Sequence, residues 1–278
     1  MMVEELASIL AKARVTKTRA QTLPIPRAEL NKLTISDGYE VMKKTAKLLE
    51  KERGWGVAGF KVGATAKAAQ DKMGLNGPFW GYIYEPAKVL ATPRNGPIPR
   101  FSVEHDLIRG IETEFAFTIK KDISPRSSPY SKEELVMDHC DRVIPCVEVC
   151  GFRLPADVGG LASLLVADTG NAAVVFPNDS FSRNAADVYK DLVHSRASIH
   201  IDGVHIGTGS GQEVLGSPLN SLEWLVKEAV GVHGLTIPQG TFVITGATSG
   251  LKPITTCCYM HASFSGISNC DVHIAFRS

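Results

Sequence analysis

The stretch from Ile111 to Phe117 places two carboxylates on one face of an otherwise apolar strand. Side chains alternate between the two faces of a strand, so Glu112 and Glu114 point one way and the apolar side chains around them point the other way. Two adjacent like charges repel and are costly to bury unless a cation neutralises them, which favours a divalent metal as their partner. Taken alone, the motif also fits a solvent-facing strand edge, which is the more common setting for such a pattern.

A second predicted strand supplies a third carboxylate. Within residues 143–150, Glu148 lies on one face between Cys146 and Cys150, and the valines lie on the other face. A lone glutamate between two cysteines is unusual on a wet surface. Three carboxylates with no histidine near them in sequence form an all-oxygen ligand set, which suits Mg²⁺ or Mn²⁺ rather than zinc. Such a set leaves coordination positions at which a substrate can chelate the ion and react.

Further motifs follow one another in a definite order along the chain: GFKVGAT at 59–65, the Glu112 and Glu114 pair, Glu148, VADTGN at 166–171, VLGSPL at 214–219 and GTFVITG at 240–246. From about Thr16 to Phe276, this series resembles the fumarylacetoacetate hydrolase superfamily, in its branch of 2-keto-4-pentenoate hydratases and 4-oxalocrotonate decarboxylases. The resemblance implies an α+β fold, with a small helical N-terminal part and a larger mixed β-sheet roll of the fumarylacetoacetate hydrolase C-terminal domain type.

The resemblance also implies roles for single residues. The metal-binding carboxylates of the family match Glu112, Glu114 and Glu148, and its active-site lysine matches Lys61. We predict substrate contacts for four more residues, which are Arg153, Asp168, Thr248 and Ser249. For Arg153 the contact is a clamp on a distal carboxylate, and the alternative is an exposed structural arginine.

Two positions depart from the family's pattern. Phe79 stands where the hydratases tend to carry an aspartate, and Asn171 with Ala172 stands where they tend to carry a serine. These departures leave the three metal ligands intact. They change residues that handle protons, so they bear on which reaction the chain catalyses.

The ligand set suits chemistry on a 2-oxo acid. Such an acid chelates a divalent cation through a carboxylate oxygen and its 2-oxygen, and the ion stabilises negative charge that develops on the 2-oxygen. Lys61, flanked by Gly59 and Gly63, is expected beside the metal in a partly dry pocket, where burial and the cation lower its pKa and suit it for proton transfer. We therefore predict a metal-dependent hydro-lyase that hydrates a 2-hydroxy-dienoate or 2-oxo-enoate from a degradation pathway.

Three other functions remain open. Two of them are reactions of the same superfamily, namely decarboxylation of a 2-oxo-enedioate such as 4-oxalocrotonate and hydrolysis of an acylpyruvate. The third is a homologue without catalysis that serves in binding or assembly, which Phe79 and the missing serine favour. Retention of all three glutamates and Lys61 favours an enzyme.

Patterning along the 278 residues predicts an α-rich part at 1–98, which carries Lys61, and a β-rich metal-binding part at 99–278, separated at a Pro/Gly-rich stretch. Periodicity predicts helices at 1–14, 28–52, 66–73 and 219–230, with caps at Ser36–Asp37 and Ser221. Alternation predicts strands at 112–120, 143–150, 171–176, 197–202, 241–245 and 271–277, and Asp202–Gly203 predicts a hairpin turn.

Composition limits the classes of molecule that this protein is expected to bind. With 30 basic and 29 acidic side chains, the net charge of +1 gives no reason to expect binding to nucleic acid or to an anionic membrane. The apolar runs are too short for a membrane span and no signal-peptide core opens the chain, so we expect a cytoplasmic protein. The resemblance implies a homo-oligomer.

The six cysteines match neither a zinc knuckle nor a disulfide scaffold, so we interpret them as reduced thiols. A zinc site built from His139, Cys140, Cys146 and Cys150 is disfavoured by strand geometry around Glu148. The eight histidines form no metal-binding pair in sequence. We interpret His105, His261 and His273 as structural or solvent-facing.

Overall fold

The computed structural model describes residues 2–18, 26–30, 32–90, 96–154, 170–178 and 181–278. Its α-helices are α1 (Met2–Thr16), α2 (Arg27–Leu30), α3 (Ile35–Arg53), α4 (Lys67–Met73), α5 (Lys132–Glu134), α7 (Ala185–Val188) and α8 (Pro218–Leu225). Its strands are β1 (Val57–Gly63), β2 (Phe79–Tyr84), β3 (Lys88–Leu90), β4 (Arg100–Ser102), β5 (Ile108–Ile119), β6 (Cys140–Gly151), β7 (Asn171–Phe176), β8 (Arg183–Asn184), β9 (Arg196–Ile201), β10 (Val204–Ser210), β11 (Phe242–Ile244), β12 (Lys252–Pro253), β13 (Cys258–Ser265) and β14 (Cys270–Arg277).

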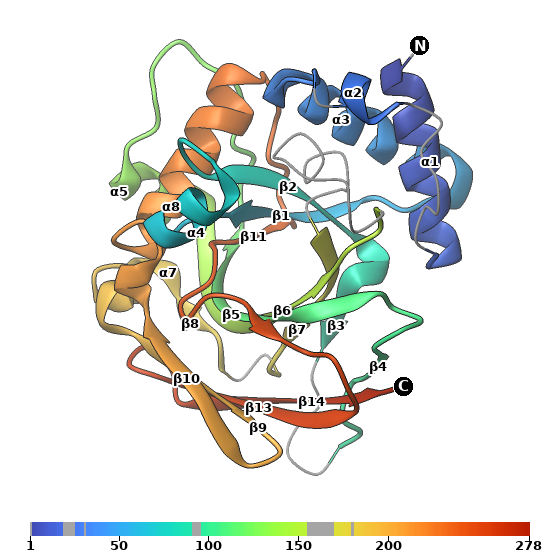
Figure 1. Ribbon diagram of the computed structural model, residues 1–278. Coiled ribbons are helices and arrows are strands. Elements are labelled where there is room, and N and C mark those ends of the chain that lie inside the picture. Colours follow the sequence, from blue (N-terminus) through green and yellow to red (C-terminus); the bar gives the residue numbers. More distant parts are fainter. Residues whose placement is uncertain (1, 19–25, 31, 91–95, 155–169, 179–180) are drawn as a thin grey trace.

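The strands form two sheets. The larger has the order β2-β1-β11-β5-β6-β7-β3, with β12 beside β5 and β8 beside β6, and the smaller has the order β10-β9-β13-β14-β4. In Figure 1 the smaller sheet lies below the larger sheet, and helices α1, α2 and α3 lie above the larger sheet. Buried aromatic rings join the sheets, since Phe115 of β5 and Phe264 of β13 have centroids 5.9 Å apart. The predicted α+β class with a mixed β roll is confirmed.

The first 98 residues contribute strands to the larger sheet. β1 runs parallel to β11 and antiparallel to β2. Sequence patterning does not predict β1, because its central residues are buried on both faces and so do not alternate between apolar and polar. Strands from both sides of residue 98 hydrogen bond within one sheet, so the proposed division at that residue does not separate two sheets.

The helix predicted over 28–52 is in fact two helices, α2 and α3. A capping box at Thr34 starts α3, because the Thr34 hydroxyl accepts from the Asp37 amide and the Asp37 carboxylate accepts from the Thr34 amide. The predicted cap at Ser36–Asp37 is therefore wrong by two residues. Gly54 ends the helix with a φ of 68°, in the left-handed region that glycine tolerates.

α8 also begins earlier than predicted. Ser217 is its N-cap and Pro218 occupies the first turn, where the ring's restricted φ suits a helix start. The predicted cap, Ser221, lies inside the helix, where its hydroxyl donates to the Thr245 carbonyl at 2.6 Å. The helix continues into a π-helical segment over Val226–Val232.

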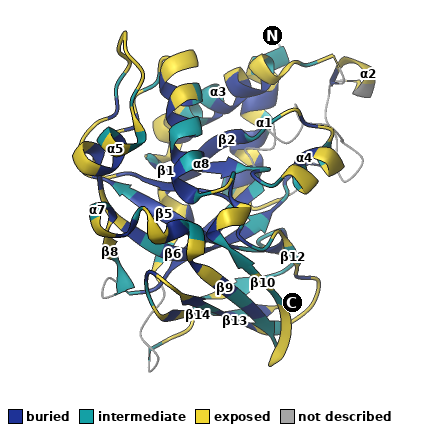
Figure 2. Cartoon of the chain, turned by 90° about the vertical axis from the view of Figure 1, so that its left-hand side faces the viewer, coloured by how far each residue is buried: buried dark blue, intermediate teal, exposed yellow. Residues whose placement is uncertain are grey.

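Most other predicted elements are present. The strand predicted over 171–176 coincides with β7, and the others overlap β5, β6, β9, β11 and β14. Asp202 and Gly203 turn between β9 and β10 with φ values of 49° and 79°, so the predicted hairpin is confirmed. Figure 2 shows strands β1, β5 and β6 largely buried and the outer surfaces of the helices exposed. No helix in the described ranges is both long and apolar enough to cross a membrane.

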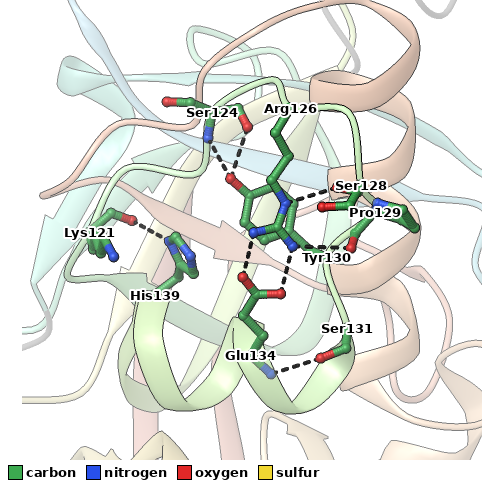
Figure 3. Close-up of polar contacts among 9 residues, drawn as sticks. All are labelled: Lys121, Ser124, Arg126, Ser128, Pro129, Tyr130, Ser131, Glu134 and His139. Carbon is green, nitrogen blue, oxygen red and sulfur yellow. Dashed lines mark hydrogen bonds and ion pairs between the residues drawn. The ribbon is translucent and has the colours of Figure 1, made fainter.

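The loop between β5 and β6 is held by its own side chains (Figure 3). The Arg126 guanidinium donates to Glu134 at 2.6 Å and lies 3.5 Å from the centroid of the Tyr130 ring. The Tyr130 hydroxyl in turn donates to the Ser124 carbonyl at 2.8 Å. His139 packs against Tyr130 with ring centroids 5.1 Å apart, which gives this histidine a structural role.

Candidate active site

The register of the larger sheet brings the three predicted metal ligands to one face. Glu112 of β5 pairs directly with Glu148 of β6, and Glu114 lies two residues further along β5. Directly paired residues of neighbouring strands share a face, as do residues two apart on one strand. The predicted carboxylate face is therefore present in the fold.

Lys61 reaches the same face from β1. Its partner on β11 is Ile244, which pairs with Ala116, and Ala116 shares the face of Glu112 on β5. The Lys61 Nζ lies 2.6 Å and 2.7 Å from the two carboxylate oxygens of Glu148. The exposed fractions of Lys61 and Glu148 are 4% and 0%, so this ion pair is buried.

Asn171 supports Glu148 from the neighbouring strand β7. Its side-chain amide donates to Glu148 Oε1 at 2.9 Å. The sequence pattern marks Asn171 only as the place of a missing serine, and gives no sign of this bond. The pairing of β6 with β7 creates it, so Asn171 is a positioning residue for the carboxylate.

Glu114 is fully buried. One of its oxygens accepts from the Gly246 amide at 2.6 Å, and the other oxygen, Oε1, has no hydrogen-bond partner among the described residues. Gly246 has a φ of 106°, and a Cβ there would lie 2.5 Å from Thr65, so glycine permits this close approach. Burial first, and then the charges of Glu148 and Glu112, raise the pKa of Glu114 well above its ordinary value.

Glu112 is half-buried beside the Cys150 thiol. Burial and the adjacent charge of Glu148 raise the pKa of Glu112 to about 7, although Lys61 and a bond from Cys150 act in the opposite direction. Ligand atoms of Glu112, Glu148 and Cys150 lie within 4.8 Å of one another. Burial also raises the pKa of Cys150 well above its ordinary value, so this side chain stays a thiol.

Lys61, Glu112 and Cys150 open onto a cavity of about 640 Å³. Its walls come from β1, β2, α4, β5, β6 and the loop after β11, and include Lys61, Thr65, Phe79, Arg109, Glu112 and Cys150. Phe79 is buried and faces Gly63, where a Cβ would lie 2.4 Å from the ring. The cavity wall is therefore apolar at Phe79.

The predicted substrate contacts lie apart from this cavity or outside the described residues. Arg153 is buried, donates to the Asn171 carbonyl at 2.8 Å and lines a different cavity of about 260 Å³. The hydroxyls of Thr248 and Ser249 contact Thr113 at 2.8 Å and 3.3 Å, on the opposite face of β5 from the glutamates. Asp168 lies outside the described residues.

We expect burial and a bound cation to lower the pKa of Lys61, but in the metal-free protein the pKa moves in the opposite direction. Burial by itself lowers the pKa, but the facing carboxylates, Glu148 foremost, outweigh it and raise the pKa above its ordinary value. Lys61 is therefore an ammonium group here.

The face fits a hard divalent cation. Three carboxyl groups meet a single ammonium, so when ionised they carry more negative charge than Lys61 neutralises, and burial together with this repulsion raises the pKa of Glu112 and Glu114. Glu114 Oε1 is buried and has no hydrogen-bond partner in the described chain. Carboxylate oxygens are the ligands that Mg²⁺ and Mn²⁺ prefer. Glu112, Glu114 and Glu148 could hold such an ion, whereas the protonated Cys150 is a poor ligand.

In the metal-free protein, we expect Glu112 to make the folded state less stable as pH rises towards neutral. Folded Glu112 keeps its proton up to about pH 7, whereas the unfolded chain loses it near 4.5. The unfolded state binds fewer protons between these values, so this group makes the free energy of unfolding fall as pH rises through that window. In EDTA, we expect a lower Tm at about pH 7.5 than at about pH 5.5, and Mg²⁺ should restore it. Glu112→Gln should weaken this dependence, and an identical pH profile in variant and wild type would contradict the assignment.

The sequence matches known enzymes, although no family model matches it. It is 30% identical over 214 residues to a 4-oxalocrotonate decarboxylase of Pseudomonas putida, covering 77% of this chain and 75% of that protein. The chain belongs to the 2-keto-4-pentenoate hydratase and 4-oxalocrotonate decarboxylase branch of the fumarylacetoacetate hydrolase superfamily. A 2-hydroxypent-2,4-dienoate hydratase of P. putida is 28% identical over 226 residues, with coverage of 81% and 94%.

Solved structures of other enzymes share the fold of this chain. The 4-oxalocrotonate decarboxylase from P. putida G7, complexed with magnesium and adipate, superposes with a TM-score of 0.83 at 22% identity, over 99% of this chain and 97% of that chain. The fumarylpyruvate hydrolase from P. aeruginosa, in complex with Mn²⁺ and pyruvate, superposes with a TM-score of 0.53 at 16% identity, over 78% and 88%. At these identities the likeness supports the fold.

Proposed function

We propose that this chain is a divalent-metal-dependent hydro-lyase that adds water to a 2-hydroxy-dienoate or a 2-oxo-enoate. The observation that carries the proposal is the shared face of Glu112, Glu114, Glu148 and Lys61. From this face Glu112 and Lys61 line a cavity large enough for a small acid. The match to a hydratase over 94% of that relative's length supports the reaction class.

Glu112, Glu114 and Glu148 would hold Mg²⁺ or Mn²⁺. When bound, the ion supplies a positive charge that chelates the carboxylate and the 2-oxygen of a 2-oxo acid and stabilises negative charge there. Superfamily members solved with magnesium and adipate, and with Mn²⁺ and pyruvate, support this choice of ion.

Lys61 would handle the proton. Its Nζ is held by Glu148 and stays protonated in the field of the carboxylates, so it can deliver a proton to a carbon of the dienol and take one up later in the cycle. The apolar ring of Phe79 limits water beside the ammonium. Asn171 orients Glu148, and through it the lysine.

A second candidate function is decarboxylation of a 2-oxo-enedioate. The positively charged side chain of Arg109 in the cavity wall favours it. Arg109 lines the cavity, and its guanidinium lies 5.7 Å from the centroid of the Phe152 ring. No carboxylate in the described chain forms an ion pair with it. A guanidinium with one face on an aromatic ring and no acidic partner suits a second carboxylate on the substrate.

Arg109→Ala separates the two candidates. If the substrate is a dicarboxylate, we expect its KM to rise by roughly 10- to 100-fold, the worth of one charge-assisted hydrogen bond, while kinetics on a monocarboxylate stay unchanged. Steady-state assays with Mg²⁺ measure both. Arg142→Ala, an exposed arginine at the start of β6 and outside the cavity lining, is the matched control. An equal KM change for both substrates would exclude a contact with the distal carboxylate.

The function itself is tested by assaying 2-hydroxypenta-2,4-dienoate and 4-oxalocrotonate side by side with Mg²⁺. Water addition to the first supports the hydro-lyase, and CO₂ release from the second supports the decarboxylase. Turnover of neither, with oxalate binding that EDTA does not remove, would favour the non-catalytic homologue. Acylpyruvate hydrolysis, homo-oligomeric assembly and a cytoplasmic location stay predictions.

A further inference from the structure

Four histidines form a row across the smaller sheet. His205 of β10 pairs directly with His200 of β9, His200 pairs with His261 of β13, and His261 pairs with His273 of β14. The ring centroids of successive histidines lie 5.2 Å, 5.7 Å and 4.7 Å apart. Most of these residues lie far apart in the sequence, and the register of the four strands brings them together.

The row lies on the solvent side of the sheet. On β13 and β14, the residues that alternate with the histidines are buried, among them Met260, Ala262, Val272 and Ile274. The side chain of His261 is 32% exposed and that of the nearby Asp271 is 54% exposed. Ions can therefore reach these side chains from water without any change in the core.

One end of the row has the composition of a metal site. The Nε2 of His261 lies 2.9 Å from Asp271 Oδ1, and ligand atoms of His261, Asp271 and His273 all lie within 4.8 Å of one another. Nitrogen and oxygen ligands bind a zinc ion at about 2.0–2.2 Å, so ligand atoms around one ion are roughly 3–3.5 Å apart. Small side-chain rotations of surface residues close the remaining distance.

Neighbouring hydroxyls hold these ligands in place. The Tyr259 hydroxyl and His273 Nδ1 are 2.7 Å apart, and the Ser263 hydroxyl donates to Asp271 Oδ1 at 2.8 Å. The Tyr259 backbone amide donates to the Asp202 carboxylate at 2.8 Å, which ties this position to the β9–β10 hairpin. Partners of this kind orient metal-binding imidazoles and carboxylates in proteins.

We propose that His261, Asp271 and His273 bind a first-row transition cation such as Zn²⁺ at the surface of the smaller sheet. Two imidazoles and one carboxylate select such an ion over Mg²⁺, because imidazole is a borderline ligand that Mg²⁺ does not favour. Water completes the coordination. The site lies on a different sheet from the three glutamates, and it stands whether or not the proposed lyase activity is correct.

Calorimetric titration of the full-length protein with ZnCl₂, in saturating MgCl₂, tests the site. Wild type should bind Zn²⁺, and His261→Ala and His273→Ala should each weaken binding by at least roughly 10- to 100-fold, since even partners of a ligand have effects of that size. Tyr259→Phe keeps the ring and removes the hydroxyl, and should weaken binding by about 10-fold. His194→Ala changes an exposed histidine outside the row and should bind as wild type.

Glu112→Gln separates this site from the carboxylate face, and should leave Zn²⁺ binding at the histidine row unchanged. Zn²⁺ should also raise the Tm of wild type and of His194→Ala, but not that of His261→Ala, because a ligand stabilises only the state that binds it. Zn²⁺ affinity unchanged in both His261→Ala and His273→Ala would overturn the proposal, as would loss of all Zn²⁺ binding in Glu112→Gln.

Discussion

Glu148→Gln is expected to lose metal affinity and activity together. The substitution removes one of three charges that hold a divalent ion, and it removes the carboxylate that pairs with Lys61 at 2.6 Å. Outer partners of metal ligands typically contribute 10- to 100-fold to affinity, so loss of a ligand itself should weaken Mn²⁺ binding by at least about 100-fold. Titration with Mn²⁺, followed by electron paramagnetic resonance, measures this directly.

Asn171→Ala serves as a milder control for Glu148→Gln, because it changes a partner of the ligand and not the ligand itself. It removes only the amide that donates to Glu148 at 2.9 Å, so the three carboxylates remain. We expect it to weaken Mn²⁺ binding by about 10- to 100-fold, and excess metal should restore its turnover. If Glu148→Gln binds Mn²⁺ as tightly as wild type, the carboxylate face is not the metal site.

Lys61→Met is expected to separate metal binding from catalysis. Methionine is apolar and close to lysine in length, so it fills the buried space without a charge. Lys61 occupies both oxygens of Glu148 in the metal-free protein, so its removal frees a ligand, and Mn²⁺ affinity should be retained or increased. Turnover should fall by a factor on the order of 10² to 10⁴, the usual contribution of a positioned acid or base.

Lys61→Arg distinguishes charge from proton transfer. The guanidinium keeps the ion pair with Glu148 but does not give up its proton in proteins. If Lys61 acts by moving a proton, the arginine variant should be about as inactive as the methionine variant. Full turnover of either variant at saturating Mg²⁺ would show that another group moves the proton.

The ion pair also bears on the non-catalytic alternative. A binding protein without chemistry has no need for a buried lysine among its ligands, because an ammonium competes with the cation for the same carboxylate. Retained Mn²⁺ binding in Lys61→Met, together with lost turnover, would therefore favour the enzyme. Equal ligand binding and absent turnover in wild type and variant would favour the homologue without catalysis.

The sequence alone determined the parts of this protein that rest on local periodicity. Alternation over 111–117 and 143–150 places Glu112, Glu114 and Glu148 on single faces of their strands, and the Asp202–Gly203 pair specifies its hairpin. The spacing of motifs along the chain identifies the family. These features depend on neighbours in sequence, so the residues themselves carry them.

Tertiary structure alone decided everything that depends on which strands meet. β1 is buried on both faces and so lacks an alternating signature, yet its place in the sheet brings Lys61 to Glu148. The raised pKa of Lys61 in the metal-free protein follows from that encounter with carboxylates on other strands, whereas the sequence led us to expect a lowering by burial and a bound cation. Arg153 lies near Glu148 in sequence but lines a different cavity, whereas Arg109 lines the cavity of Lys61. The histidine row exists because four strands pair in one register, and pairing between distant strands is a property of the folded chain.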